Sequence, residues 1–251
     1  MAGIALTGSA SGIGAATREL LEVDGQRVIG VDLRDAEVTA DLGTAEGRAN
    51  ALAGVLDACD HVLDGFAGFA GVPAVAVPPE LLVTVSYFGA VAMLDGLRAA
   101  LTLGGATAAI AVSSCAATVA PVDGTLVEAC LAGDERGAVA LGVPGGVASA
   151  SVKLAIARWV RRNSGSWAAD GVRLNALAPG NTDTPLTKVT LDDPEIGPLM
   201  REIPMPIGRW AEPSEIASAA RWMLSPGSSF MVGSVLFVDG GTDALVRPDT
   251  F

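Results

Sequence analysis

The sequence predicts an α/β fold, a doubly wound parallel sheet with helices on both faces. Short apolar runs alternate along the 251 residues with longer segments whose apolar residues recur at helical spacing. Half of the residues are hydrophobic, which suits one large sheet covered by helices that are rich in small residues. A glycine-rich turn joins the first apolar run to the first helical segment.

The first predicted elements surround this turn. Residues 3–7 form an apolar run that predicts a strand, and residues 12–23 carry apolar side chains at helical spacing. A second apolar run, 27–33, predicts the next strand. Residues 38–42 predict a short strand that ends at an acid, Asp41.

The middle of the chain continues the alternation. Residues 45–58 predict a helix, and 61–66 predict a strand. Prolines at both ends of 73–79 indicate a loop. Residues 81–101 have the apolar spacing of a helix, and the apolar run 106–112 predicts a buried strand.

Residues 122–146 predict an excursion from the sheet. They contain a possible helix at 126–131, which is followed by glycines and by a Pro-Gly-Gly breaker. Residues 147–162 predict a long helix whose last residues include three arginines, which suits the negative end of a helix dipole. Residues 172–177 predict the next strand, which Pro179 ends.

The last third predicts a covering segment and two further elements. Residues 182–210 carry five prolines and are long for a connection, which indicates a substrate loop or lid. Residues 212–223 predict a helix, and 234–238 predict the final strand. Since no linker divides the chain, residues 1–251 are expected to form a single domain.

Charge and cysteine usage exclude several classes of function. The net charge of −12 repels phosphate backbones, so nucleic-acid binding is not expected. Three cysteines without metal-like spacing and one histidine predict no metal site and no disulfide framework. No signal peptide or membrane span is expected, so the predicted location is the cytoplasm.

The glycine-rich turn, residues 7–14, has the composition of a pyrophosphate site. Such a turn bares backbone N–H groups at the positive end of a helix dipole. Asp32 follows about 20 residues later at a strand end, where an acid accepts hydrogen bonds from a ribose diol. The alternatives are a glycine-rich turn without a ligand and an aspartate that only caps a turn.

Several motifs, taken in order, resemble the short-chain dehydrogenase/reductase family, whose domain is a Rossmann-type sheet. They cover nearly the whole chain and include a Thr-Gly-x3-Gly-x-Gly turn, Asp32 as the mark of NAD(H), and a Val-Asp-Gly-Gly signature at 238–241. The resemblance implies NAD(H) as cofactor. It implies contacts from Thr7, Gly8, Ser11, Gly12, Ile13, Gly14, Asp32, Leu33, Asp41, Leu42, Ala70, Gly71, Lys153, Pro179, Gly180, Thr182 and Thr184. Among these, the resemblance implies that Asp41 and Leu42 contact the adenine.

Other stretches resemble one subgroup, the bacterial 3α-hydroxysteroid dehydrogenase/carbonyl reductases. These are residues 87–90, 209–215 and 224–226, together with the long spacing between Ser114 and Ser149. In that subgroup an added segment, similar in place to residues 122–146, lies where other members of the family form a subunit interface. The resemblance therefore implies a homodimer that uses another surface.

The catalytic positions match the family only in part. In the family a tyrosine exchanges a proton with the substrate oxygen, a lysine four residues later lowers its pKa, a serine orients the substrate, and an asparagine supports a relay water. Ser114 and Lys153 match the serine and the lysine. Ser149 stands at the tyrosine position and Ser86 at the asparagine position, and the chain's only tyrosine is Tyr87.

The expected function is NAD(H)-dependent interconversion of an apolar secondary alcohol and its ketone, with impaired or altered proton transfer. Loss of general acid–base help typically costs about 10²–10⁴-fold in rate. One alternative is an NAD(H)-binding pseudoenzyme or regulatory subunit. Another is non-redox chemistry, as a dehydratase, isomerase or cyclase. A last alternative is that the serines at 149 and 86 were introduced deliberately.

Overall fold

The computed structural model describes residues 3–105 and 107–250, and their strands form one parallel sheet of seven strands in the order β3-β2-β1-β4-β5-β6-β7. Ala106, where the fifth predicted strand begins, lies outside the described residues. The strands are β1 (Gly3–Thr7), β2 (Val28–Asp32), β3 (Val38–Thr39), β4 (Leu63–Gly68), β5 (Ala108–Val112), β6 (Arg173–Pro179) and β7 (Val235–Val238).

The helices connect and cover these strands. They are α1 (Gly12–Val23), α2 (Ala45–Ala58), α3 (Pro79–Val83), the π-helix η1 (Thr84–Gly89), α4 (Ala90–Leu103), α5 (Ala116–Val119), α6 (Gly124–Leu131), α7 (Glu135–Ala140), α8 (Gly145–Ala169), α9 (Pro185–Leu191), α10 (Ile196–Glu202), α11 (Pro213–Leu224), the 3₁₀-helix η2 (Pro226–Ser228) and α12 (Thr242–Val246).

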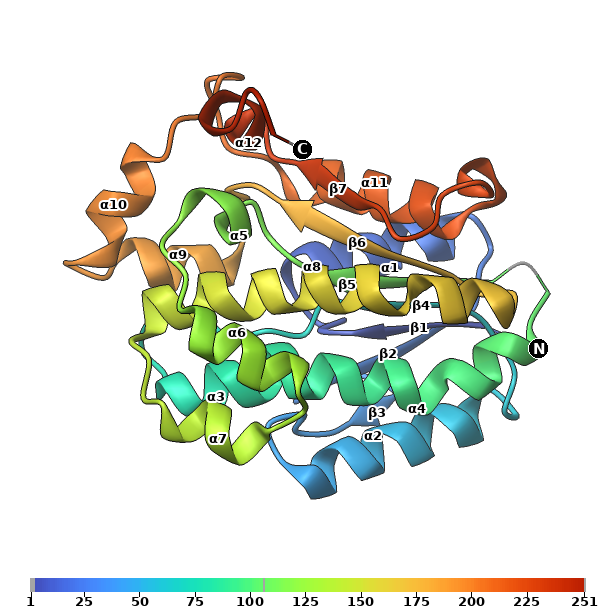
Figure 1. Ribbon diagram of the computed structural model, residues 1–251. Coiled ribbons are helices and arrows are strands. Elements are labelled where there is room, and N and C mark those ends of the chain that lie inside the picture. Colours follow the sequence, from blue (N-terminus) through green and yellow to red (C-terminus); the bar gives the residue numbers. More distant parts are fainter. Residues whose placement is uncertain (1–2, 106, 251) are drawn as a thin grey trace.

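The sheet has a hydrophobic core on each face, as the sequence predicts. In Figure 1, α2, α4 and α8 cover one face and α1 and α11 lie behind the other. Neighbouring residues of β1 point to opposite faces, so Ala5 packs in the first core and Leu6 in the second. Leu94 and Val160 come from helices of the first face, and Met223 comes from α11 on the second.

The carboxyl ends of the parallel strands meet at one edge of the sheet. The strand order reverses between β1 and β4, because β2 and β3 extend the sheet on one side and the later strands extend it on the other. Ligands of open α/β sheets bind in the crevice at such a reversal. The turn after β1 therefore lies where the sequence places its candidate site.

Helix α8 is longer than the sequence predicts. It continues past residue 162 to Ala169 despite Gly165, because no proline interrupts this stretch and Trp167 is fully buried in the first core. The arginines therefore lie inside the helix and not in its last turn. Arg158 and Arg162 instead lie near the carboxylate of Glu128 in α6, at 3.4 and 3.7 Å.

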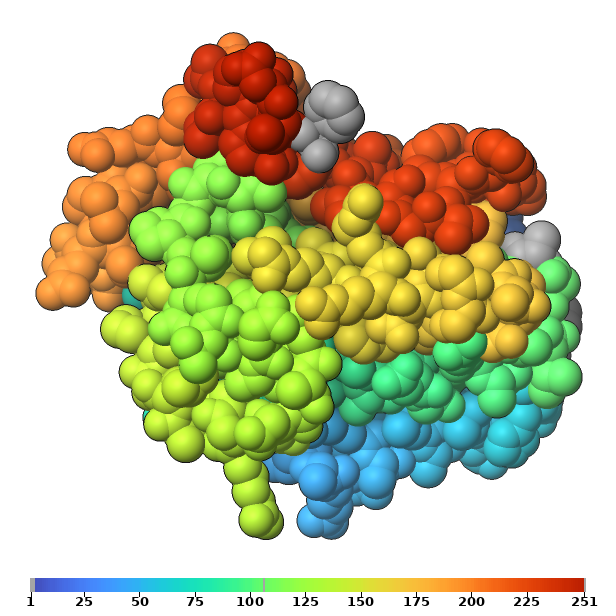
Figure 2. Space-filling model, in the orientation of Figure 1, coloured from blue at the N-terminus to red at the C-terminus, as the bar shows by residue number. Residues whose placement is uncertain are grey.

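The excursion at 122–146 contains two helices where the sequence predicts one. Helix α6 matches the expected helix, but α7 forms in a stretch interpreted as turn-forming, because Asp134 caps it by accepting a hydrogen bond from Gly137 N at 2.9 Å. Both helices rest on the first face, with α6 against α8 and α7 against α3. Figure 2 shows them as a yellow-green lobe beside the yellow α8.

Two other segments have more regular structure than the sequence predicts. The lid at 182–210 contains α9 and α10, joined by a short turn. The predicted helix at 81–101 is interrupted by the π-helix η1, and its buried residues include Ser86 and Tyr87. π-turns within helices occur frequently at functional sites.

The continuous helical stretch Pro79–Leu103 has the length and apolar composition of a membrane span, with a mean hydropathy of 1.4 over its best 18-residue window. Of that window, 56% is buried inside the fold. Met93, Leu94 and Leu97 are fully buried in the first core. This is the position of a core helix.

Candidate active site

The glycine-rich turn is shaped by glycines that no other residue could replace without moving the backbone. Gly8 has φ of +69°, and a Cβ there would lie 2.7 Å from the backbone N of Ala70. A Cβ on Gly14 would lie 2.0 Å from the carbonyl oxygen of Gly8. The turn therefore packs directly against the segment that follows β4 and brings the start of α1 close to β1.

The start of α1 retains free hydrogen-bonding capacity. Ser11 is the N-cap residue, it is exposed, and its side chain makes no capping hydrogen bond. The first N–H groups of a helix have no partner within the helix. An unused hydroxyl beside these N–H groups is a suitable site for an anion such as a diphosphate.

Asp32, at the end of β2, faces this turn. Its Oδ2 accepts a hydrogen bond from Ala10 N at 3.0 Å, and its Oδ1 accepts one from Leu33 N at 2.7 Å. Asp32 lines a hollow of about 310 Å³ together with Ala10, Ser11 and residues 33–35. A carboxylate in such a hollow can accept hydrogen bonds from the diol of a ribose.

A second hollow of about 360 Å³ adjoins the first through Leu33 and includes Asp41. Asp41 Oδ1 accepts a hydrogen bond from Gly43 N at 2.8 Å, whereas the Leu42 side chain is buried in the first core. Of these two predicted contact residues, only Asp41 presents its side chain to solvent.

The loop after β6 meets the glycine-rich turn. Thr184 caps α9 by accepting a hydrogen bond from Thr187 N at 3.1 Å, and a Cβ on Gly12 would lie 3.4 Å from its methyl group. Gly180 lies so close to Asp239 that a Cβ on Gly180 would lie 2.6 Å from the Cα of Asp239. Thr182 is buried, and its hydroxyl donates to the carbonyl of Gly180 at 3.0 Å.

Two other predicted contact residues have structural partners. The Thr7 hydroxyl is buried and accepts a hydrogen bond from Ala70 N at 3.2 Å, which ties the end of β1 to the segment after β4. Ile13 packs at the edge of the second core. Both residues hold the turn in place.

Lys153 lies on α8 against the end of β5. Its Nζ donates to the carbonyl of Val112 at 2.8 Å, and its own carbonyl accepts from the Ser113 hydroxyl at 2.8 Å. Desolvation by the surrounding protein lowers the pKa of Lys153 to about 8. An ammonium group that gives up its proton this readily is suited to acid–base chemistry.

Ser114 follows Ser113 at the same strand end. Its Oγ accepts a hydrogen bond from Ala116 N at 3.2 Å and donates to the carbonyl of Pro179 over a long 3.5 Å. Such a weak donor interaction leaves the hydroxyl able to turn toward a ligand. The neighbouring Cys115 is buried in the protein, and burial raises the pKa of its thiol to about 11.

The two remaining candidate serines differ in surroundings. Ser149 is half-buried one helical turn before Lys153, and within residues 3–105 and 107–250 its hydroxyl makes no hydrogen bond to protein. Ser86 is buried in η1, and a Cβ on Gly71 would lie 3.7 Å from its Oγ. The structure thus brings Ser86 next to a predicted cofactor contact.

Tyr87 does not replace a missing phenol at this site. It is 1% exposed and packs edge-to-face against Phe88, with ring centroids 5.1 Å apart. Burial raises the pKa of its phenol far above the ordinary value. Tyr87 is a residue of the first core.

A family model described as enoyl-(acyl carrier protein) reductase matches residues 106–243. The chain is 42% identical over 254 aligned residues to the 3-alpha-hydroxysteroid dehydrogenase/carbonyl reductase of Comamonas testosteroni, covering 99% of each chain. The chain belongs to the short-chain dehydrogenase/reductase family. The predicted resemblance and the predicted fold class are therefore confirmed, and the family is one of oxidoreductases.

Two further relatives are similar to this chain over nearly its whole length. The crystal structure of the 3-alpha-hydroxysteroid dehydrogenase from Pseudomonas sp. B-0831 complexed with NADH has a TM-score of 0.95 and 49% identity, covering 99% of each chain. The 2,5-dichloro-2,5-cyclohexadiene-1,4-diol dehydrogenase of Sphingobium indicum is 31% identical, covering 96% of this chain and 97% of the relative.

The sequence also carries a signal for a buried ion pair that the predicted site does not include. Arg48, Ala51 and Val55 share one face of α2 at helical spacing, and all three are buried. An arginine on the apolar face of a helix requires a partner inside the fold. That partner is Glu135 of the excursion at 122–146, at 2.5 Å.

Proposed function

We propose that the chain is an NAD(H)-dependent oxidoreductase that interconverts an apolar secondary alcohol and its ketone, with weakened proton transfer. The observation that carries this proposal is the open start of α1 beside the Asp32 carboxylate. The glycine cradle and the free Ser11 hydroxyl fit a diphosphate, and Asp32 fits the adjacent ribose.

The residues at the reaction end would act as follows. Bound NAD(H) supplies or accepts a hydride. Ser114 would orient the substrate oxygen, and the Lys153 ammonium would stabilise negative charge on it. Ser149 provides only an alkanol where the family has a phenol of ordinary pKa about 10, so direct proton transfer from residue 149 is weak.

The substrate class follows from the lid at 182–210. Leu186, Val189 and Leu199 on α9 and α10, and Ile207 after them, are exposed large hydrophobic residues. Such a surface favours an apolar alcohol, ketone or alicyclic ligand over a sugar phosphate. The names of the hydroxysteroid dehydrogenase relatives are consistent with this choice.

The test measures binding and turnover separately. NADH and NADPH are titrated against the protein by cofactor fluorescence, and reduction of apolar ketones is followed by NADH absorbance. Preferential NADH binding with slow reduction supports the proposal. Binding without any turnover favours an NAD(H)-binding regulatory protein, and lack of NADH binding excludes both.

We also propose a cytoplasmic homodimer that uses α11 and the β7 edge. Phe230 is fully exposed, and Trp222 and Val232 are 44% and 40% exposed on the same part of the chain. The excursion covers α3 and α8 on the first face, so an apolar surface at β7 is the better candidate for a second copy. Light scattering of the protein and of Phe230→Asp tests this: the variant is expected to be monomeric.

A further inference from the structure

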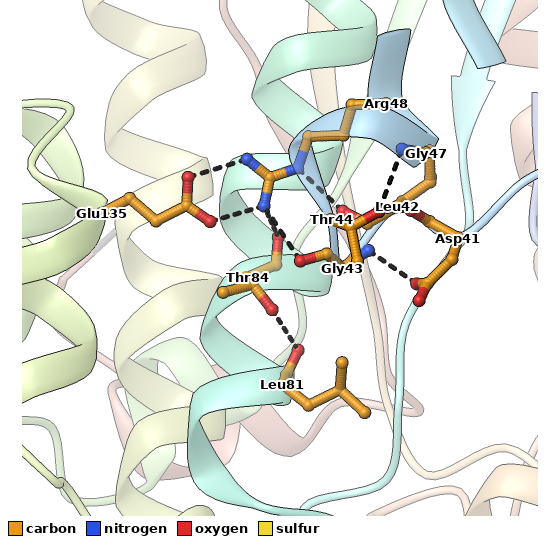
Figure 3. A network of polar contacts seen from close by, with 9 residues as sticks. All are labelled: Asp41, Leu42, Gly43, Thr44, Gly47, Arg48, Leu81, Thr84 and Glu135. Carbon is orange, nitrogen blue, oxygen red and sulfur yellow. Dashed lines mark hydrogen bonds and ion pairs between the residues drawn. The ribbon is translucent and has the colours of Figure 1, made fainter. Parts of the chain in front are cut away.

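The guanidinium of Arg48 joins three segments that are distant in sequence (Figure 3). Its Nη1 and Nη2 donate to the two carboxylate oxygens of Glu135, at 2.8 and 2.5 Å. Its Nε donates to the carbonyl of Leu42 at 2.8 Å, and Nη2 also reaches the carbonyls of Gly43 and Thr84 at 3.5 and 3.4 Å. Parallel hydrogen bonds of this kind fix both partners in orientation as well as in distance.

The loop 41–43 depends on these contacts because the neighbouring sheet holds it weakly. It follows β3, which has only two residues and pairs with β2 through Val38 and Thr39. Arg48 accounts for hydrogen bonds to two successive carbonyls of the loop, those of Leu42 and Gly43. The position of Asp41 therefore follows the position of the guanidinium.

The carboxylate of Glu135 holds the guanidinium in turn. The Arg48 side chain is 11% exposed, so its charge requires a compensating carboxylate. Glu135 begins α7, which rests on α3 and η1. The excursion thus supplies the counter-charge for a residue that contacts the loop of Asp41.

The same guanidinium reaches the reaction end. Thr84 is the first residue of η1, the π-helix that contains Ser86. Its carbonyl accepts from Arg48, and its hydroxyl donates to the carbonyl of Leu81 at 3.1 Å. One buried cation therefore connects the Asp41 loop with the helix that places Ser86.

We propose that Arg48 and Glu135 are positioning residues that set the affinity for the adenine end of the dinucleotide, with the excursion as their anchor. This inference rests on the proposed NAD(H) function. It assigns the excursion a role in cofactor binding in addition to covering α3 and α8. The ligand chemistry concerned is an adenine nucleotide held by the loop of Asp41.

The experiment compares three ligands on the full chain and on Glu135→Gln. The ligands are NADH, AMP and reduced nicotinamide mononucleotide, titrated by fluorescence or calorimetry. Glu135→Gln is expected to raise the Kd of NADH and of AMP about tenfold, within the range found for residues of one polar network. The Kd of the mononucleotide is expected to stay within about twofold, because it lacks the adenine.

The matched control is Glu128→Gln on the same excursion. Glu128 is 61% exposed and lies near two exposed arginines, so the control removes a carboxylate without touching the Asp41 loop. It is expected to leave all three Kd values within about twofold. Glu135→Asp keeps the charge and serves as the second variant if Glu135→Gln does not fold, with partial recovery of NADH affinity expected.

The outcomes separate this inference from the function on which it rests. If the unaltered chain does not bind NADH, the proposed function is wrong. If it binds NADH and Glu135→Gln binds NADH equally well, only the positioning role is wrong. Equal weakening of NADH and of the mononucleotide also overturns that role, because it indicates general loosening of the fold.

Discussion

The two ends of the candidate crevice differ in how many of the polar groups expected from the family resemblance they carry. At the nucleotide end, the glycines of the turn, Ser11 and Asp32 form a cradle open to a diphosphate and a ribose. At the reaction end, Ser114 and Lys153 lie at the end of β5 without a phenol between them. Under the proposed function, binding a cofactor and turning it over are therefore expected to be separable properties of this chain.

The largest expected effect comes from restoring a phenol at the reaction end. Ser149→Tyr is expected to raise the rate of ketone reduction about 10²–10⁴-fold, because it supplies a general acid one helical turn before Lys153. The rate is measured at saturating NADH, with Ser149→Ala as the control, which is expected to match the unaltered chain within about twofold. If Ser149→Tyr binds NADH but gains no activity, the reaction end serves a different chemistry.

The half-buried Lys153 predicts a pH-dependent stability. In the folded chain its pKa is about 8, against 10.5 as the ordinary value, so between these pH values the unfolded chain binds the extra proton. The free energy of unfolding should therefore rise with pH across this window relative to Lys153→Met, by at most about 3 kcal/mol. Urea unfolding of the unaltered chain and of Lys153→Met, without cofactor at pH 7.5 and 10.5, measures this change. If the two free energies of unfolding differ by the same amount at both pH values, the assigned pKa is wrong.

At the nucleotide end, the carboxylate of Asp32 is expected to determine cofactor choice. Asp32→Asn should raise the Kd of NADH about tenfold, since hydrogen bonds to a charged group contribute about 1.5–3 kcal/mol each. The Kd of NADPH should change less, because the repulsion of its 2′-phosphate is removed. Fluorescence titration gives the ratio of the Kd values for NADH and NADPH. If Asp32→Asn leaves this ratio unchanged, the ribose does not bind at Asp32.

The smallest expected effect tests whether Ser11 is reserved for the ligand. Ser11→Ala should leave the free energy of unfolding within about 0.5 kcal/mol, because the serine makes no cap, and should raise the Kd of NADH about threefold. Thr44 is the matched control, since its hydroxyl caps α2 at 2.9 Å from Gly47 N. Thr44→Ala should cost about 1 kcal/mol of stability. If Ser11→Ala instead lowers the free energy of unfolding and leaves the Kd of NADH unchanged, Ser11 is a structural cap.

Patterns with a strong local cause could be predicted from the sequence. Runs of apolar residues predicted the strands, and the glycines predicted the turn because only glycine fits its backbone. Elements held by tertiary contacts were missed or mispredicted. Helix α7 depends on one cap and on packing against α3, and the end of α8 depends on the buried Trp167. The partner of Arg48 lies 87 residues away, a distance that no local pattern reports.

The contact between Gly12 and Thr184 has a consequence for the order of events. Thr184 caps α9, the first helix of the lid, and its methyl group lies beside the glycine-rich turn, 3.4 Å from where a Cβ on Gly12 would stand. A diphosphate arriving at that turn meets the start of the lid before any ketone is present. Binding of the cofactor is thus expected to position the lid for the ketone. We therefore expect the cofactor to enter first and leave last.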